Sequence, residues 1–492
     1  MLLKEILGEG LHFDENQIEF GDLEINGISR DSTVENTGKA YFCLTHDEEK
    51  AKVRCKQALG NGASVVFSDF NLPFEKSVKV GDCRDLFANS CANFYHRACD
   101  KLKIVGITGT NGKTTTSHVV AEMLKRNGKK VGVIGTSGVF YNGKVQECPL
   151  TTPDADFLHK TFSEMLDDGV EYVIMEVSAH AIDQKRINGI KFELGVLTNV
   201  TQDHLDYFKT FEAYEKTKLS FLTSEHIKKG IICVDDKCAR KLIGNTDVPI
   251  LTYGLFSPSD VFAIDICCSM NGSHFVGNVC DSVVDIKTNL VGQYNVYNSL
   301  ASLAVCQCLG LSEEQLVRGI NFINPVEGRF NVININGRYA VIDFAHSPDS
   351  LMNVLKTARE LTDKKVYVVF GCGGNRDKGK RPQMGKIAED YADYVCLTDD
   401  NPRLEKSLDI IADIEKGMTK PHFVESDRYK AIKKMIEIAQ PGDIIIIAGK
   451  GAEKYQEIGT EKRPYNDFES VYNYFQESNP IRNKNNKEYY GC

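Results

Sequence analysis

Short apolar runs alternate with amphipathic stretches through the middle of the chain. The runs at 103–107, 131–134, 172–177, 194–198 and 230–234 are largely apolar, and the stretches between them have helical spacing of apolar residues. This alternation predicts a mostly parallel sheet covered by helices.

The pattern changes on both sides of this central series. Upstream, strands are predicted at 40–44 and 63–67, followed by a helix at 85–96. Between 261 and 291, short alternating runs predict an antiparallel patch attached to the central sheet.

A second alternating series begins after residue 328. Its predicted strands lie at 340–344, 366–370, 394–397 and 444–448. A chain of 492 residues is too long for one core, because domains usually hold roughly 100 to 200 residues. We therefore predict an α/β protein with three domains, over residues 1–99, 100–327 and 328–492.

Composition narrows the class of protein. With 42% hydrophobic and 26% charged residues, the chain has an ordinary globular composition, and its net charge of -9 argues against nucleic-acid binding. No window approaches the ~20 apolar residues that cross a bilayer, and the N-terminus lacks a secretory signal, so we expect a cytoplasmic protein without membrane contact. The 16 cysteines include no CxxC pair, which favours reduced, mostly buried thiols. The Asn- and Lys-rich end at 479–492 predicts a frayed terminus.

A glycine-rich stretch at 106–116 carries the strongest chemical signal. It reads Gly-Ile-Thr-Gly-Thr-Asn-Gly-Lys-Thr-Thr-Thr and lies between a predicted strand and a predicted helix. Backbone N–H groups of such a turn, and the positive end of the following helix, bind phosphate oxygens. Ile107 stands where the strict phosphate-loop pattern has its first glycine, so an ordinary glycine turn is the alternative. We predict an ATP site formed by Gly109, Thr110, Asn111, Gly112, Lys113, Thr114 and Thr115.

Two further side chains, Glu176 and His204, are candidates for metal binding by their position alone. Glu176 lies at the end of one predicted strand and His204 follows another, and the carboxyl ends of parallel strands face the crevice where ligands bind. A Mg2+ ligand is one interpretation of Glu176, and a solvated carboxylate is the other. His204 is either a ligand or a packed histidine, and Lys218, judged by pattern alone, is a surface lysine.

Several motifs in order give the chain a family resemblance. They are Gly109–Thr114, Thr151-Thr-Pro153, Glu176-Val-Ser178, Thr198-Asn199, Asp203-His-Leu-Asp206, Gly328-Arg-Phe-Asn331, Asp343-Phe-Ala-His346 and Asp400-Asn-Pro-Arg403. Together they resemble the Mur ligase family of peptidoglycan synthesis over nearly the whole chain. The resemblance implies a uridine-binding α/β domain, a central phosphate-loop domain and a Rossmann-like C-terminal domain.

The resemblance also implies the chemistry. Members of the family use ATP to activate a carboxylate as an acyl phosphate, which an amine attacks to form an amide. Two Mg2+ ions offset the phosphate charge. By resemblance, Thr114 and Glu176 hold the first ion, and His204 with a carbamylated Lys218 holds the second, while Lys113 contacts phosphate. Asn295, Arg329 and Asp343 match positions near adenine, ribose and phosphates.

Two more groups of residues match substrate positions in the family. Thr151, Thr152, Ser178, Gln184 and Arg186 match those that grip a UDP-muramoyl-dipeptide, and Ser32 and His46 are candidates for uracil and diphosphate contacts. The stretch 45–50 lacks the family's usual glycine-containing uridine loop, and Thr33 replaces the usual arginine.

The third-domain loops match an amino-acid pocket. Its residues by position are Arg376, Asp400, Asn401, Pro402, Arg403, Gly449 and Glu453. The Asp-Asn-Pro-Arg motif is found in members that add meso-diaminopimelate, whose distal carboxylate suits an arginine fork. A helix-capping turn is a compatible structural interpretation of this motif. Ala452 replaces the family's usual histidine and weakens the assignment.

Alternatives remain at this point. In the first, the same reaction uses L-lysine or another amino acid as acceptor. In the second, the chain is a folylpolyglutamate-type ligase. In the third, it is a non-catalytic paralogue. A folylpolyglutamate-type ligase should lack a domain before the glycine loop, and a paralogue would not retain Lys113, Glu176, His204 and Lys218 together. We expect small-molecule substrates and a monomer.

Overall fold

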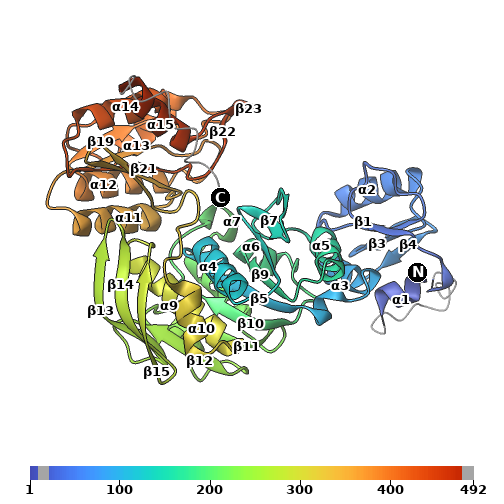
Figure 1. Cartoon of the computed structure of the whole chain (residues 1–492). Helices are drawn as coiled ribbons and strands as arrows, with labels where there is room; N and C mark the ends of the chain where they lie inside the picture. The colour runs from blue at the N-terminus through green and yellow to red at the C-terminus, as the bar shows by residue number, and fades with distance from the viewer. Residues whose placement is uncertain (9–20, 479–492) are drawn as a thin grey trace.

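The computed structural model describes residues 1–8 and 21–478. Three sheets lie in succession from the N-terminal to the C-terminal end, and each is covered by helices (Figure 1). The α/β class predicted from the sequence is confirmed. The boundaries after residues 99 and 327 stay predictions, and the predicted frayed end at 479–492 lies outside the described residues.

The first sheet is parallel and small. Its strands, in spatial order, are β1 (Gly27–Ser29), β2 (Lys39–Phe42), β3 (Val65–Ser68) and β4 (Ser77–Lys79). Its helices are α1 (Leu3–Leu7), α2 (Glu48–Gly60) and α3 (Cys83–Phe94). Successive strand residues point to opposite faces. Phe42 therefore packs in one core cluster with Phe87 of α3, whereas Tyr41 packs in another with Cys55 of α2.

The central sheet has eleven strands in the order β15-β14-β13-β12-β11-β10-β5-β9-β6-β7-β8. The strands are β5 (Lys103–Thr108), β6 (Val131–Gly135), β7 (Gly138–Tyr141), β8 (Lys144–Gln146), β9 (Tyr172–Glu176), β10 (Phe192–Leu197), β11 (Ile227–Cys233), β12 (Ile250–Gly254), β13 (Val261–Ser269), β14 (Gly272–Val279) and β15 (Ser282–Thr288). The run from β6 to β12 is parallel, and β13, β14 and β15 form the antiparallel patch that the sequence predicts.

Helices cover both faces of the central sheet. They are α4 (Lys113–Arg126), α5 (Ala155–Asp167), α6 (Ala179–Asp183), α7 (Leu205–Phe208), α8 (Phe211–Ser220), α9 (Gln293–Cys308) and α10 (Glu313–Ile320), with 3-10 turns at Ala98–Lys101 and Ala239–Leu242. One face packs against α4, α9 and α10, and the other packs against α5 and the segment around Tyr214 and Phe221. The centre of the sheet is therefore buried on both sides.

The C-terminal sheet has six strands in the order β16-β17-β21-β18-β19-β20. The strands are β16 (Asn331–Ile335), β17 (Arg338–Asp343), β18 (Val366–Phe370), β19 (Tyr394–Leu397), β20 (Phe423–Val424) and β21 (Ile444–Ala448), and β22 (Tyr455–Ile458) pairs with β23 (Glu461–Pro464) in a separate hairpin. The helices are α11 (Pro348–Leu361), α12 (Lys380–Tyr391), α13 (Ser407–Glu415), α14 (Arg428–Ile438) and α15 (Asp467–Ser478). Within the six-stranded sheet, all strand pairs except β16–β17 are parallel.

Parallel strands bring their carboxyl ends to one edge of a sheet. In the central sheet, the loops after β5, β9 and β10 share such an edge, and in the C-terminal sheet the loops after β17, β18, β19 and β21 do. Asp349 at the start of α11 contacts Asn111 of the glycine loop, so these two edges face each other.

Two sequence expectations concern the molecule as a whole. No helix in the described part of the chain is long and apolar enough to cross a membrane. The cysteines in the described ranges are free thiols, and most of them are buried, as expected.

Candidate active site

The backbone of the glycine loop between β5 and α4 lies in close contact with neighbouring segments. Gly109 and Gly112 have φ values of 146° and 88°, in the region that favours glycine. A Cβ on Gly109 would lie 1.8 Å from Thr198 Oγ1, and one on Gly112 would lie 2.6 Å from Asn298 Oδ1. The loop therefore requires glycine at both positions.

The end of β10 holds this loop in place. Asn199 accepts from the Thr110 N–H through its carbonyl and from the Asn111 N–H through Oδ1, both at 2.9 Å. Thr198 Oγ1 donates to the Asn111 carbonyl at 2.6 Å. Thr198 and Asn199 appear in the sequence only as parts of a motif, and spacing alone gives them no supporting role.

Two lysines converge on one carbonyl oxygen of the loop. Lys113 Nζ and Lys218 Nζ both donate to the Gly109 carbonyl at 2.8 Å. Lys218 is only 1% exposed and lies over the Tyr214 ring, so its interpretation as a surface lysine is wrong. Burial, and then the charge of Lys113, hold the pKa of Lys218 well below its usual value. Burial also lowers the pKa of Lys113.

Glu176 is fully buried at the end of β9. Its carboxylate accepts from Thr114 Oγ1 at 3.0 Å and from the backbone N–H of Thr136 at 2.9 Å. The interpretation of Glu176 as a solvated carboxylate is therefore wrong. Thr136, which the sequence did not single out, also donates its hydroxyl to Glu176 Oε2 at 3.2 Å.

These oxygen atoms suit Mg2+. Mg2+ usually binds through one or two carboxylates plus substrate phosphates and water, rather than through an all-protein cage. Within residues 1–8 and 21–478, no group of three or more His, Cys, Asp and Glu residues is arranged to hold a metal ion. The Thr114 hydroxyl beside the Glu176 carboxylate fits a site of the first kind.

His204 directly precedes helix α7 as its N-cap and has a left-handed backbone conformation, with φ at 54°. Its Nε2 atom lies 3.5 Å from Asp203 Oδ2, and its ring packs against His180 at 4.8 Å and Tyr214 at 6.2 Å between centroids. Burial is the main cause that lowers the pKa of His204. A neutral imidazole is the form that can bind a metal ion.

A cavity of about 400 Å³ lies between the glycine loop and the C-terminal part. Its walls include Asn111, Gly112, Thr115, Asn298, Arg329 and Asp343. Arg329 Nη2 donates to Thr114 Oγ1 at 3.2 Å, which links the third sheet to the loop. Asp343 accepts from the Phe330 and Ala345 N–H groups at 2.8 and 2.7 Å, and burial raises its pKa.

Asn295 lies behind this cavity rather than on its wall. It is 3% exposed, it donates to the Val291 carbonyl at 2.8 Å, and it accepts from Asn298 Nδ2 at 2.9 Å. Asn298, which the sequence did not single out, is the residue that reaches the cavity.

The residues predicted to bind the muramoyl-dipeptide form one cluster. Thr152 Oγ1 donates to the Glu176 carbonyl and accepts from the Ser178 N–H, both at 2.9 Å. Arg186 donates to the Thr152 carbonyl at 2.9 Å and to Gln184 Oε1 at 2.6 Å. Thr151 joins through its hydroxyl, 3.1 Å from that of Thr136. The cluster therefore adjoins the Glu176 strand end.

The first part of the chain reaches this cluster through Arg30. Arg30 Nη2 lies 2.8 Å from Asp154 Oδ2, and Asp154 Oδ1 lies 3.1 Å from Arg186 Nε. Ser32 is buried and donates to Gln57 of α2 at 3.0 Å, whereas His46 is exposed and lies 3.3 Å from Asp69. These contacts of Ser32 and His46 stay within the first sheet and its helices.

Two hydrogen-bonded groups occupy the loops after β19 and β21. Buried Lys450 donates to Asn401 Oδ1 at 3.0 Å and to Glu453 Oε2 at 2.8 Å, and Asn401 Nδ2 donates to Glu453 Oε2 at 3.0 Å. Arg403 pairs with Glu457 at 2.8 Å and donates to the Gly374 carbonyl at 3.0 Å. The sequence did not single out Lys450 or Glu457.

The remaining predicted pocket residues lie around these groups. Gly449 has φ at 116°, and a Cβ there would lie 2.5 Å from Asp400 Oδ2, while Pro402 is buried and Arg376 is exposed. The capping interpretation of the Asp-Asn-Pro-Arg turn is wrong, because α13 begins at Ser407 with Lys406 as its cap. A Cβ on Gly328 would lie 2.1 Å from the Ala452 nitrogen, so the loop of Ala452 packs on the start of the third sheet.

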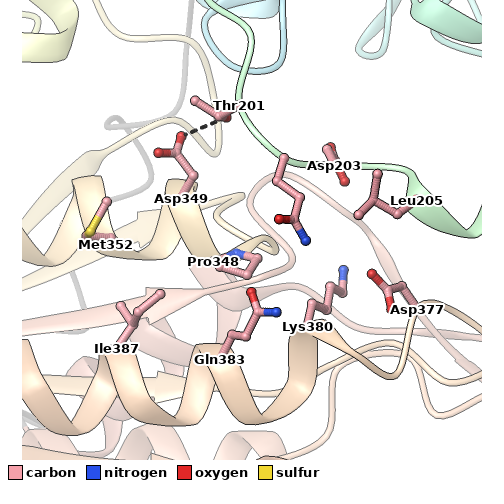
Figure 2. A pocket seen from close by; sticks show the side chains of 11 residues that line it. Thr201, Asp203, Leu205, Pro348, Asp349, Met352, Asp377, Lys380, Gln383 and Ile387 are labelled. Atoms are coloured by element: carbon pink, nitrogen blue, oxygen red, sulfur yellow. Dashed lines mark hydrogen bonds between the residues drawn. The ribbon is translucent and has the colours of Figure 1, made fainter. Parts of the chain in front are cut away.

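A second cavity of about 260 Å³ separates the loop at 201–205 from helices α11 and α12. Asp349 reaches across it and accepts from Thr201 Oγ1 at 3.3 Å, as Figure 2 shows. The same carboxylate oxygen accepts from Asn111 at 2.6 Å. Lys380, at the start of α12, and Asp377, just before that helix, lie opposite Asp203 in this cavity (Figure 2).

The glycine loop with Lys113, the buried Lys218 beside it and the adjoining cavity define a nucleotide-binding α/β enzyme of the phosphate-loop class. Models of the Mur ligase middle domain and of the Mur ligase glutamate ligase domain match residues 107–306 and 328–451. UDP-N-acetylmuramoyl-L-alanyl-D-glutamate–2,6-diaminopimelate ligase 1 of Clostridium acetobutylicum is 38% identical, over 97% of this chain and 100% of its own. This chain belongs to the Mur ligase family.

Solved structures agree with this assignment. The structure of a UDP-N-acetylmuramoyl-L-alanyl-D-glutamate–2,6-diaminopimelate ligase is similar with a TM-score of 0.72 and 32% identity, covering 97% of this chain and 99% of that one. A folylpolyglutamate synthase of Mycobacterium tuberculosis shares the fold with a TM-score of 0.60 and 15% identity, covering 74% of this chain and 91% of that one.

Proposed function

We propose that this chain is an ATP-dependent ligase that adds meso-diaminopimelate to UDP-N-acetylmuramoyl-L-alanyl-D-glutamate in peptidoglycan precursor synthesis. The main support is that the glycine loop faces the edge of the C-terminal sheet at which its parallel strands end. The Asp400–Arg403 loop lies at that edge. The name of the C. acetobutylicum relative states this reaction, and the similarity of the two sequences supports the same substrates for this chain.

The proposed reaction has two chemical steps. A carboxylate oxygen of the muramoyl-dipeptide attacks the γ-phosphorus of ATP, which gives an acyl phosphate and ADP. The amine of meso-diaminopimelate then attacks the acyl carbon, forms the amide, loses a proton and expels inorganic phosphate. Gly109 to Thr115 hold the triphosphate, Lys113 offsets its charge, and Asn295, Arg329 and Asp343 support the nucleoside.

We propose that Thr114 and Glu176 bind one Mg2+ and that His204 and Lys218 bind a second. Bound Mg2+ would offset phosphate charge and so permit attack by one anion on another. Lys218 would take part as a carbamate, in which Nζ bonds to the carbon of CO2 and loses one proton. Burial favours the neutral amine that this reaction needs, and the remaining N–H can still donate to the Gly109 carbonyl.

We propose that the acceptor lies among Arg376, Asp400, Asn401, Pro402, Arg403, Gly449 and Glu453. The guanidinium of Arg403 would exchange its contact with Glu457 for the distal carboxylate of meso-diaminopimelate. Glu453 would bind the distal ammonium, in place of part of its contact with Lys450. Lysine has no second, distal carboxylate for Arg403 to bind.

The muramoyl-dipeptide would contact Thr151, Thr152, Ser178, Gln184 and Arg186, with Ser32 toward its uridine end. The Arg30–Asp154–Arg186 contacts support this, because they join the first sheet to the cluster. We propose that the chain works as a monomer in the cytoplasm, where ATP is available.

The choice of acceptor tests the proposal. Purified protein is mixed with ATP, Mg2+ and the UDP-muramoyl-dipeptide, and phosphate release is measured with meso-diaminopimelate or with L-lysine. We expect kcat/KM for lysine to be lower by ~10^3-fold or more, because lysine lacks the distal carboxylate that Arg403 would bind. Equal turnover with lysine would contradict the assignment of meso-diaminopimelate as the acceptor. ATP binding without turnover of any amino acid would favour a non-catalytic paralogue.

A further inference from the structure

Arg381 is a fully buried arginine that the proposed reaction does not use. It is the second residue of α12, and its side chain is 0% exposed. Its guanidinium donates to both carboxylate oxygens of Glu405, from Nη1 to Oε2 at 2.9 Å and from Nη2 to Oε1 at 3.0 Å. It also donates to Asp413 Oδ2 at 2.9 Å and to the Gly373 carbonyl at 3.2 Å. Two parallel hydrogen bonds between a guanidinium and a carboxylate fix geometry as well as balance charge.

The two loops that Arg381 contacts carry the proposed acceptor residues. Gly373 belongs to the loop after β18, which also holds Arg376. Glu405 belongs to the loop after β19 and follows Arg403 by two residues. Because Arg381 binds one residue of each loop, it fixes the position of one loop relative to the other.

Further hydrogen bonds join these two loops around the buried pair. Glu405 Oε1 also accepts from the Asn375 N–H at 2.5 Å, and Asn375 Oδ1 accepts from the Leu404 N–H at 3.0 Å. Arg403 Nη1 donates to the Gly374 carbonyl at 3.0 Å. The Glu405 carboxylate and the Arg403 guanidinium are therefore bound to adjacent residues of the loop after β18.

The backbone at Arg403 has a conformation that needs support from its surroundings. The φ values are 51° for Arg403 and 54° for Asn375, in the left-handed region that residues other than glycine adopt less often. Such conformations persist where the surrounding contacts over-determine them. The hydrogen bonds from Arg381 lower the pKa of Glu405 to about 2, so this carboxylate stays charged and keeps its contacts.

We infer that Arg381 and Glu405 are positioning residues that hold Arg403 in place to bind the distal carboxylate of the acceptor. The inference rests on the proposed function, because it takes Arg403 as an acceptor residue. Neither Arg381 nor Glu405 needs to touch the acceptor. Without the pair, Arg403 would keep its charge but lose its fixed position, so the acceptor would bind less tightly while ATP binding would not change.

The variant Glu405→Gln tests the inference by steady-state kinetics, because it keeps the size of the side chain and removes its charge. We expect KM for meso-diaminopimelate to rise about tenfold, with kcat and KM for ATP nearly unchanged. The matched control is Glu389→Gln, in a buried carboxylate of α12 that accepts from the Thr419 and Lys420 N–H groups. Both variants should lower the melting temperature, and Glu405→Gln alone should raise this KM.

A double variant shows whether Glu405 acts through Arg403. In protein that carries Arg403→Ala, the addition of Glu405→Gln should not raise KM for meso-diaminopimelate further, because the positioned residue is already absent. Additive effects of the two substitutions would overturn the inference. An equal rise of this KM in Glu389→Gln would also overturn it, since the effect would then be a general loss of stability.

The variant Asn375→Gly serves if Glu405→Gln does not fold. It removes the contact with Leu404 at an exposed position and leaves the buried charges in place, and it should raise the same KM. An unchanged KM for meso-diaminopimelate in the folded variants would overturn the inference and leave the proposed function intact. Wild-type turnover without preference for meso-diaminopimelate over lysine would overturn the proposed acceptor, and the inference with it.

Discussion

At the scale of single residues, burial changes the chemistry that the sequence allows. Lys218 and Lys113 donate to the same carbonyl oxygen, and their like charges are unfavourable in a buried site. A neutral or carbamylated Lys218 removes that repulsion. The pKa of Lys218, a side chain that the pattern would leave in solvent, is therefore strongly altered by its surroundings.

Carbamylation of Lys218 can be tested directly. We expect protein equilibrated with 13C-bicarbonate to show a carbamate carbon signal by NMR, because the buried amine is neutral at a lower pH than a free lysine. The variant Lys218→Arg should lose the signal. Lys216→Arg, an exposed position on the same helix, should keep it. A wild-type spectrum without a carbamate signal would contradict the proposed second metal site.

Arg403 gives a second residue-scale prediction. We expect Arg403→Ala to raise KM for meso-diaminopimelate by about 100-fold or more, since a bidentate charged contact is lost, while KM for ATP changes little. Steady-state kinetics with each substrate varied would measure this. Arg463→Ala, an exposed arginine on the neighbouring hairpin, is the matched control and should behave like wild type. Equal changes in both KM values would speak against a role in acceptor binding.

At the scale of elements, the strand–loop–helix unit from β5 to α4 depends on backbone geometry. Its glycines permit left-handed φ values and direct packing against the end of β10. The glycine loop could be predicted because it is local in sequence. The contacts of Thr198 and Asn199 with this loop could not, because they join segments about 90 residues apart.

Gly109→Ala should disrupt this unit. A Cβ would meet Thr198 Oγ1 at 1.8 Å, so we expect a loss of about 2 to 4 kcal/mol in unfolding free energy and loss of ATP binding. Gly128→Ala tests the backbone term alone, because its φ is 75° with nothing within 4 Å of the new Cβ, and it should cost about 1 kcal/mol. Urea unfolding and ATP titration measure both variants. Similar losses in the two variants would show that the close contact is unimportant.

At the scale of the whole molecule, the site lies between sheets rather than within one. Asp349 of the third part accepts from Asn111 and Thr201 of the central part, and Arg329 donates to Thr114. These contacts hold two strand-end edges opposite each other. Domain movement would therefore change the distance between the phosphate loop and the acceptor pocket.

Asp349→Ala should loosen the third part relative to the central one. We expect a larger radius of gyration by small-angle X-ray scattering and a lower kcat/KM, because the contacts with Asn111 and Thr201 are lost. Asp409→Ala is the control, since it also removes an acidic residue from the first turn of a helix, α13, but at an exposed position. An unchanged radius in Asp349→Ala would mean that other contacts fix the arrangement.

The sequence by itself determined the succession of strands and helices, the glycine loop and the order of the family motifs. These signals depend on local spacing, which periodicity and turn geometry make readable. Only the tertiary structure decided that Lys218 is buried beside Gly109 and that Lys450 lies between Asn401 and Glu453. Burial and hydrogen-bond partners arise from contacts between distant segments, and spacing along one segment does not specify them.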